Sequence, residues 1–136
     1  KNKFRNNIFD ESKEDNPERF EDGKIATDTF LKYIYGIRGT KKERRNTLFI
    51  IDADRQNIYD KDFPKSIFFE YQRNYFIKKA NLMGFTVIDM EKVFEADFIT
   101  NSKKFEFIND GHWNSLGHEI VKNEIVRSFN FINTIK

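Results

Sequence analysis

The chain has 136 residues and a formal net charge of only +2, with 24 basic and 22 acidic side chains. This length favours a single domain, and the balanced charge gives no electrostatic case for binding nucleic acid or an anionic membrane. The chain has no cysteine, which excludes disulfides and thiol chemistry. Its longest run of aliphatic and aromatic residues, LFII, is far too short to span a bilayer.

The first 23 residues are mostly polar, and the stretch ESKEDNPERFEDG within them combines many charges with a proline and a glycine. Such a composition predicts an irregular lead-in. From Ile25 to Gly36 the apolar residues recur at roughly helical spacing, which predicts a helix. The basic stretch TKKERRN that follows is typical of a solvated loop. We therefore expect an irregular segment over residues 1–23 and one α/β domain over residues 24–136.

Two apolar runs of strand length, TLFIID and FTVIDM, flank a long amphipathic segment. A run that is apolar throughout is typical of a central strand covered on both faces. Between the two runs, residues 67–83 repeat apolar side chains at helical spacing, and Gly84 lies where a helix commonly ends. We therefore expect strands at residues 47–52 and 85–89 to be parallel neighbours in a layered α/β fold, joined by this helix.

The rest of the chain predicts a short helix over residues 91–98 and a closing helix over residues 115–131. The buried stripe of the closing helix comprises Leu116, Ile120, Val121, Ile125 and Phe129. In α/β sheets, ligands bind at the carboxyl ends of the strands. Asp52 and Asp54 follow the first apolar run and Asp89 ends the second, so these carboxylates mark the expected binding edge.

The segment INDGHWNSLGHEI contains both histidines and the only tryptophan of the chain. Asp110 and His112 are two residues apart, so a loop can direct both side chains to one point. The carboxylate then accepts from one imidazole nitrogen, which fixes the tautomer and leaves the other nitrogen free to take a proton from a nucleophile. Asn114 or Ser115 is the expected cap of the final helix. Trp113 is expected to pack beside the pair and limit access of water.

Other interpretations of this segment stay open. Asp-Gly is a common turn signal, so the Asp110–His112 spacing is also consistent with a purely structural turn. His118 lies within the closing helix, where a surface or satisfied core position is the usual one, and Trp113 is also a candidate core residue. His112, His118 and the carboxylates are possible metal ligands, yet the i, i+4 histidine pair of a helical zinc site is absent. We expect no metal and no other cofactor.

The segment INDGHWNSLGHEIVKNEI resembles the C-terminal block of the SGNH (GDSL) hydrolase family. That block is an Asp and a His close together on a loop, then Asn or Pro, then a Gly-containing helix. The Asp-x-His-Trp spelling is similar to that of some members, including relatives of carbohydrate O-acetyltransferases, whereas the more familiar spelling has two residues between Asp and His. The upstream order of DTFLKYIYGI, TLFIIDADRQNIY, an amphipathic helix and GFTVIDM fits the latter half of that fold, so the resemblance covers roughly residues 25–131.

The resemblance implies the C-terminal part of a three-layer α/β/α domain, in which Asp110 and His112 are the acid/base pair of a serine ester hydrolase. The family's Gly-Asp-Ser and Gly-x-Asn-Asp blocks are absent from this chain. We therefore expect the nucleophile and the oxyanion-hole donors upstream of Lys1. The implied substrates are acylated carbohydrates, small esters or lipids. The expected substrate crevice is lined by Asp52, Asp54, Arg55 and Trp113.

Two other functions are compatible with the same residues. A polysaccharide O-acetyltransferase of this fold would use the same acid/base pair with a sugar hydroxyl in place of water. A non-catalytic α/β domain that binds carbohydrate or a partner protein would account for the missing Gly-Asp-Ser block. For Asp52, Asp54 and Arg55, a polar loop with a local salt bridge is as good an interpretation as a crevice lining.

Overall fold

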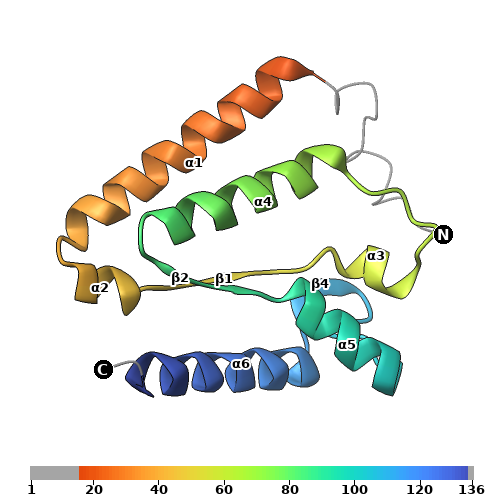
Figure 1. Ribbon diagram of the computed structural model, residues 1–136. Coiled ribbons are helices and arrows are strands. Elements are labelled where there is room, and N and C mark those ends of the chain that lie inside the picture. Colours follow the sequence, from red (N-terminus) through yellow and green to blue (C-terminus); the bar gives the residue numbers. More distant parts are fainter. Residues whose placement is uncertain (1–15, 135–136) are drawn as a thin grey trace.

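A computed structural model describes residues 16–134 of the chain (Figure 1). Helices predominate, and two short two-stranded sheets complete the described part. No helix within residues 16–134 is both long and apolar enough to cross a bilayer. In chain order the elements are α1 (Pro17–Ile37), α2 (Lys41–Arg45), β1 (Leu48–Ile51), α3 (Arg55–Tyr59), α4 (Ile67–Leu82), β2 (Thr86–Asp89), α5 (Glu91–Asn101), β3 (Glu106–Phe107), β4 (Asp110–Trp113) and α6 (Ser115–Thr134).

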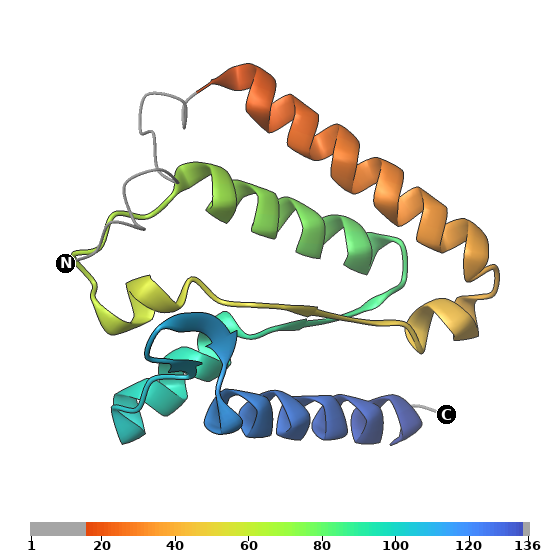
Figure 2. The same ribbon diagram turned by 180° about the vertical axis from the view of Figure 1, so that it is seen from behind.

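The two apolar runs form the parallel pair that the sequence predicts. β1 lies beside β2 with Leu48 opposite Thr86 and Ile51 opposite Asp89, and the connection between the two strands contains α3 and α4. The views from both sides show α1 and α4 on one side of this pair and α5 and α6 on the other (Figures 1 and 2). The mixed α/β character and the parallel pairing are therefore confirmed.

Each face of the β1–β2 pair has its own hydrophobic cluster. On the side of α5 and α6, Phe94 and Phe105 are completely buried and their rings stack with centroids 4.5 Å apart. On the side of α1 and α4, Leu31 and Ala80 are completely buried and Phe85 nearly so. The strands thus separate two apolar layers, which accounts for their unbroken apolar sequence.

The long helix α4 ends as its sequence predicts. Ser66 accepts a hydrogen bond from the backbone N–H of Phe69 at its start, and Gly84 adopts a positive φ of 86° just after its end. Glycine carries no Cβ penalty in that conformation, so the chain can turn directly into β2. Of the apolar side chains that recur at helical spacing, Phe76, Ala80 and Met83 belong to the cluster on this side of the sheet, whereas Phe69 is 53% exposed.

Helix α1 begins earlier than predicted. Its first turn starts at Pro17, where Asn16 accepts a hydrogen bond from the backbone N–H of Glu18 at 3.0 Å. An Asn cap followed by proline at the first helical position is a strong helix start, and this local signal outweighs the high charge of the segment. The prediction of an irregular lead-in is therefore wrong for residues 17–23, whereas residues 1–15 lie outside the described part.

Three further differences concern local capping and helix faces. The basic stretch after α1 is the helix α2 and not a loop, because Thr40 and Glu43 form a reciprocal capping box. Helix α5 runs to Asn101, three residues beyond its predicted end. In α6, Leu116, Ile120, Val121 and Ile125 contact the core as expected, whereas Phe129 is 43% exposed.

The stacked ring pair should dominate the stability of the α5–α6 side. Phe94→Ala removes a fully buried ring and should lower the free energy of unfolding by about 3–5 kcal/mol. Ile99→Ala on the same helix is the matched control, because Ile99 is 75% exposed. Urea denaturation of both variants is the measurement, and equal losses would contradict the assigned core.

Candidate functional site

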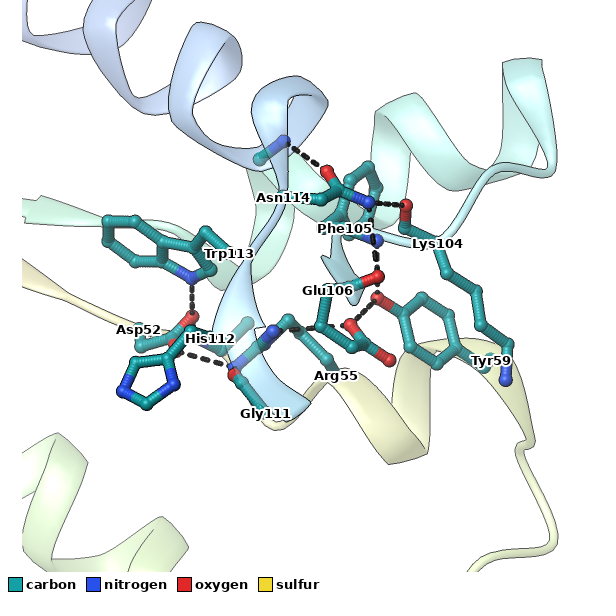
Figure 3. Close-up of polar contacts among 12 residues, drawn as sticks. Asp52, Arg55, Tyr59, Lys104, Phe105, Glu106, Gly111, His112, Trp113 and Asn114 are labelled. Atoms are coloured by element: carbon teal, nitrogen blue, oxygen red, sulfur yellow. Dashed lines mark hydrogen bonds and ion pairs between the residues drawn. The ribbon is translucent and has the colours of Figure 1, made fainter. Parts of the chain in front are cut away.

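Asp110 and His112 lie on β4, which pairs antiparallel with β3 in a short hairpin. The hairpin follows α5 and leads directly into α6. Figure 3 shows it beside the carboxyl end of β1, which carries Asp52, and the start of α3, which carries Arg55. Residues separated by about sixty positions in the chain are thereby brought to one edge of the parallel pair.

The expected contact between Asp110 and His112 is present. One carboxylate oxygen of Asp110 accepts from the backbone N–H of His112 at 3.0 Å and also contacts Nδ1 of its ring. These two hydrogen bonds, the backbone one first, hold the pKa of Asp110 below its usual range. The second ring nitrogen, Nε2, has no hydrogen-bond partner among the described residues, and the His112 side chain is 87% exposed. The arrangement orients the ring and leaves Nε2 open.

Asn114 joins the hairpin to the final helix. Its side-chain oxygen accepts from the backbone N–H of Gly117 at 3.0 Å, so Asn114 is the cap of α6. Its side-chain amide donates to the carbonyls of Lys104 and Glu106, at 2.9 and 3.1 Å. Its backbone N–H donates to the carbonyl of Phe105 at 2.8 Å. One residue therefore connects the strand before the hairpin turn to the helix after it.

Trp113 anchors the hairpin and does not cover the His112 ring. Its indole Nε1–H donates to Asp52 Oδ1 at 3.1 Å, and its ring packs edge-on against Phe94. The exposed ring of His118 lies edge-on to Trp113, with centroids 5.6 Å apart. The expectation that Trp113 limits access of water to His112 is wrong in the described structure, because that histidine is open to solvent.

Three acceptors hold the Arg55 guanidinium, two of them on the hairpin and one at the end of β1. Nη2 donates to the carbonyl of Gly111 at 2.7 Å and to Asp52 at 3.1 Å, and Nη1 donates to Glu106 at 3.1 Å. Glu106 also accepts from the hydroxyl of Tyr59 at 2.5 Å. Burial first, and then this hydrogen bond, raises the pKa of Tyr59. The side chains of Arg55 and Glu106 are only 14% and 13% exposed, so these charges are compensated within the protein.

The other two strand-end carboxylates make local contacts. Asp54 caps α3, where it accepts from the backbone and side-chain amides of Asn57 at 3.4 and 2.8 Å. Asp89 pairs with Arg73 and accepts from the backbone N–H of Glu91 at 2.9 Å. The structure therefore gathers Asp52, Arg55 and Trp113 around the hairpin but directs Asp54 elsewhere. Their role in lining a substrate crevice stays a prediction.

Glu106 and Tyr59 belong to the site although the sequence interpretation missed them. The available signal was a single carboxylate between two phenylalanines, Phe105 and Phe107, in an otherwise apolar stretch. In a strand such a carboxylate usually faces solvent, so the sequence predicts neither its burial nor the arginine that pairs with it. The described residues contain no cluster of three or more histidines and carboxylates that could hold a metal ion. No hydrogen bond joins a serine of residues 16–134 to His112.

Comparison with known proteins leaves the chain without an assigned family. No protein-family model matches the sequence, and no curated protein and no solved structure shows a significant match.

Replacing each of two glycines near the start of α6 by alanine should have very different effects on stability. A Cβ at Gly117 would lie 2.6 Å from the Phe105 carbonyl oxygen and 3.0 Å from Trp113 Cβ, whereas a Cβ at Gly111 would meet nothing within 4 Å. Gly117→Ala should therefore lower the free energy of unfolding by about 1–3 kcal/mol, and Gly111→Ala by less than about 0.5 kcal/mol. Denaturant unfolding followed by Trp113 fluorescence measures both, and similar losses would refute the close approach.

Proposed function

We propose that the chain is the acid/base-bearing part of a serine ester hydrolase of SGNH type that acts on acylated carbohydrates or small esters. The observation that carries the proposal is the Asp110–His112 contact, with Nδ1 held by the carboxylate and Nε2 open to solvent. An imidazole oriented on one nitrogen and free on the other is the base half of a nucleophilic triad. The resemblance of the INDGHWNSLGHEI segment to the family's C-terminal block supports the same assignment.

In the proposed reaction a serine from upstream polypeptide attacks the ester carbonyl. His112 Nε2 takes the hydroxyl proton, and Asp110 stabilises the imidazolium that forms. The imidazolium then gives this proton to the departing alkoxide, which leaves an acyl-enzyme. Water attacks the acyl-enzyme with Nε2 again as the base, and the serine recovers its proton as the acid leaves.

The outer edge of β1 supports the three-layer fold that this proposal requires. The carbonyls of Thr47 and Ile51 accept from β2, so the alternate backbone groups of Leu48 and Ile50 point to the opposite edge. No described strand pairs there. Parallel sheets generally have more strands and are covered on both faces. We place the missing strands of the sheet at this edge.

The exposed face of α1 is the second support for additional strands beside β1. Phe30, Tyr33 and Ile37 are 46%, 68% and 54% exposed, and the ring of Phe30 lies 6.0 Å from that of Phe49 on β1. A further strand at this edge would cover such apolar side chains. The carboxyl end of a parallel strand there would also approach Asp52, and hence the hairpin with His112. That placement would supply a nucleophile to the open ring nitrogen.

The decisive experiment compares histidine and aspartate variants of the full-length protein. His112→Ala should lower kcat for ester hydrolysis by at least about a thousandfold with a much smaller change in KM, because the base acts in the transition state. Asp110→Asn should act in the same direction, since the ring would lose its preferred tautomer. His118→Ala is the control and should leave kcat within a few-fold. If His118→Ala were inactive while His112→Ala stayed folded and active, the assignment of His112 as the base would be wrong.

The isolated 136-residue chain should show little or no activity on a small chromogenic ester. Removing the nucleophile from a triad costs several orders of magnitude in rate. Esterase assays of the purified chain are the measurement, with the full-length protein as the positive control. Robust turnover that disappears when one of the chain's own serines is changed to alanine would contradict an upstream nucleophile. Those serines are Ser12, Ser66, Ser102, Ser115 and Ser128.

A further inference from the structure

We propose that Arg55 is the positioning residue of the acid/base pair. Its guanidinium sets the orientation of the Gly111–His112 peptide group, and that peptide group sets the contact between Asp110 and the His112 ring. The role of this arrangement in catalysis rests on the proposed function, whereas the hydrogen bonds themselves are observed in the described chain.

The argument begins with the hydrogen bond from Arg55 Nη2 to the Gly111 carbonyl, at 2.7 Å. In a planar trans peptide the carbonyl and the following N–H point in opposite directions. Holding the Gly111 carbonyl toward Arg55 therefore turns the N–H of His112 away from it. That N–H donates to Asp110 Oδ1 at 3.0 Å, and the same oxygen contacts the ring Nδ1. The orientation of one peptide plane thus determines where the carboxylate meets the ring.

Gly111 makes this control necessary. A glycine has the widest backbone freedom of any residue, so its peptide groups reorient at low cost. A Cβ built at Gly111 meets nothing within 4 Å, so the surroundings do not restrain it by packing. Arg55 Nη2 donates a hydrogen bond directly to the Gly111 carbonyl. The guanidinium therefore restrains the Gly111–His112 peptide at its carbonyl, as Asp110 does at its N–H.

Arg55 can act as a fixed support because two further acceptors hold its guanidinium. Asp52 and Glu106 accept from it at 3.1 Å each, from the β1 end and from β3. Tyr59 in turn fixes Glu106, since its hydroxyl donates to the carboxylate at 2.5 Å and accepts from the Phe105 backbone N–H at 3.0 Å. A guanidinium presents five N–H donors in a rigid plane, which suits three acceptors in different directions. A lysine ammonium on a flexible stem does not reproduce this fork.

The test uses isotope-labelled 136-residue chain and needs no catalysis. In the wild type, the ring ¹⁵N shifts of His112 should report a neutral form protonated at Nδ1, and Asp110 should titrate below its usual range. In Arg55→Met the His112 ring should lose this tautomer preference, and the pKa of Asp110 should rise toward its ordinary value because the backbone donor is lost. Arg127→Met is the matched control, since Arg127 pairs with Glu124 on α6 and its side chain is 75% exposed. That variant should leave both signals unchanged.

Arg55→Lys keeps the inference falsifiable if Arg55→Met does not fold. The lysine retains a charge for Asp52 and Glu106, so the Trp113 indole N–H signal should stay that of the folded chain, yet the His112 tautomer and Asp110 titration should change as in Arg55→Met. A folded Arg55 variant with wild-type His112 and Asp110 signals would overturn the inference. Because the readouts are tautomer and pKa, loss of the hydrolase assignment would leave this result standing, and the reverse also holds.

Discussion

The guanidinium of Arg55 connects parts of the protein that neither helix nor sheet hydrogen bonds join. It lies at the start of α3, just beyond β1, and its hydrogen bonds reach the carbonyl of Gly111 and the carboxylate of Glu106 on the distant hairpin. A cation that is only 14% exposed is costly unless it is paired and hydrogen-bonded, and here three acceptors receive hydrogen bonds from Arg55. These hydrogen bonds help to fix the position of the hairpin relative to the parallel strands.

The hairpin that carries Asp110 and His112 is anchored to the core, whereas the His112 ring is exposed to solvent. Next to the proposed acid/base pair, Trp113 donates a hydrogen bond to Asp52 and packs against Phe94, so the hairpin is joined to the hydrophobic core. The His112 side chain, in contrast, is 87% exposed. Catalysis by a histidine base gains from exclusion of water and from a positioned nucleophile. A His112 ring that is oriented by Asp110 and exposed to solvent fits the proposal that further polypeptide completes the site from the side of β1.

Much of this organisation follows from local sequence features. The apolar runs, the amphipathic segment between them and the glycine after it predicted the parallel strands and α4, because these signals depend on side-chain periodicity and φ preference. Predictions of irregular structure were wrong at Pro17 and at the Thr40–Glu43 capping box, because each highly charged stretch begins with a helix cap and is helical. Charge density alone is a weak guide there, since charged side chains are compatible with a solvated helix face.

The sequence by itself determined the α/β grammar, the capped final helix and the closeness of Asp110 to His112, because each depends on residues a few positions apart. Only the tertiary structure decided that Arg55, Glu106 and Tyr59 form one hydrogen-bonded network, because the sequence does not indicate which charged residues some fifty positions apart will pair. It also decided that Trp113 anchors the hairpin to the core. That outcome depends on packing against Phe94 and on a hydrogen bond to Asp52, neither of which has a local sequence pattern.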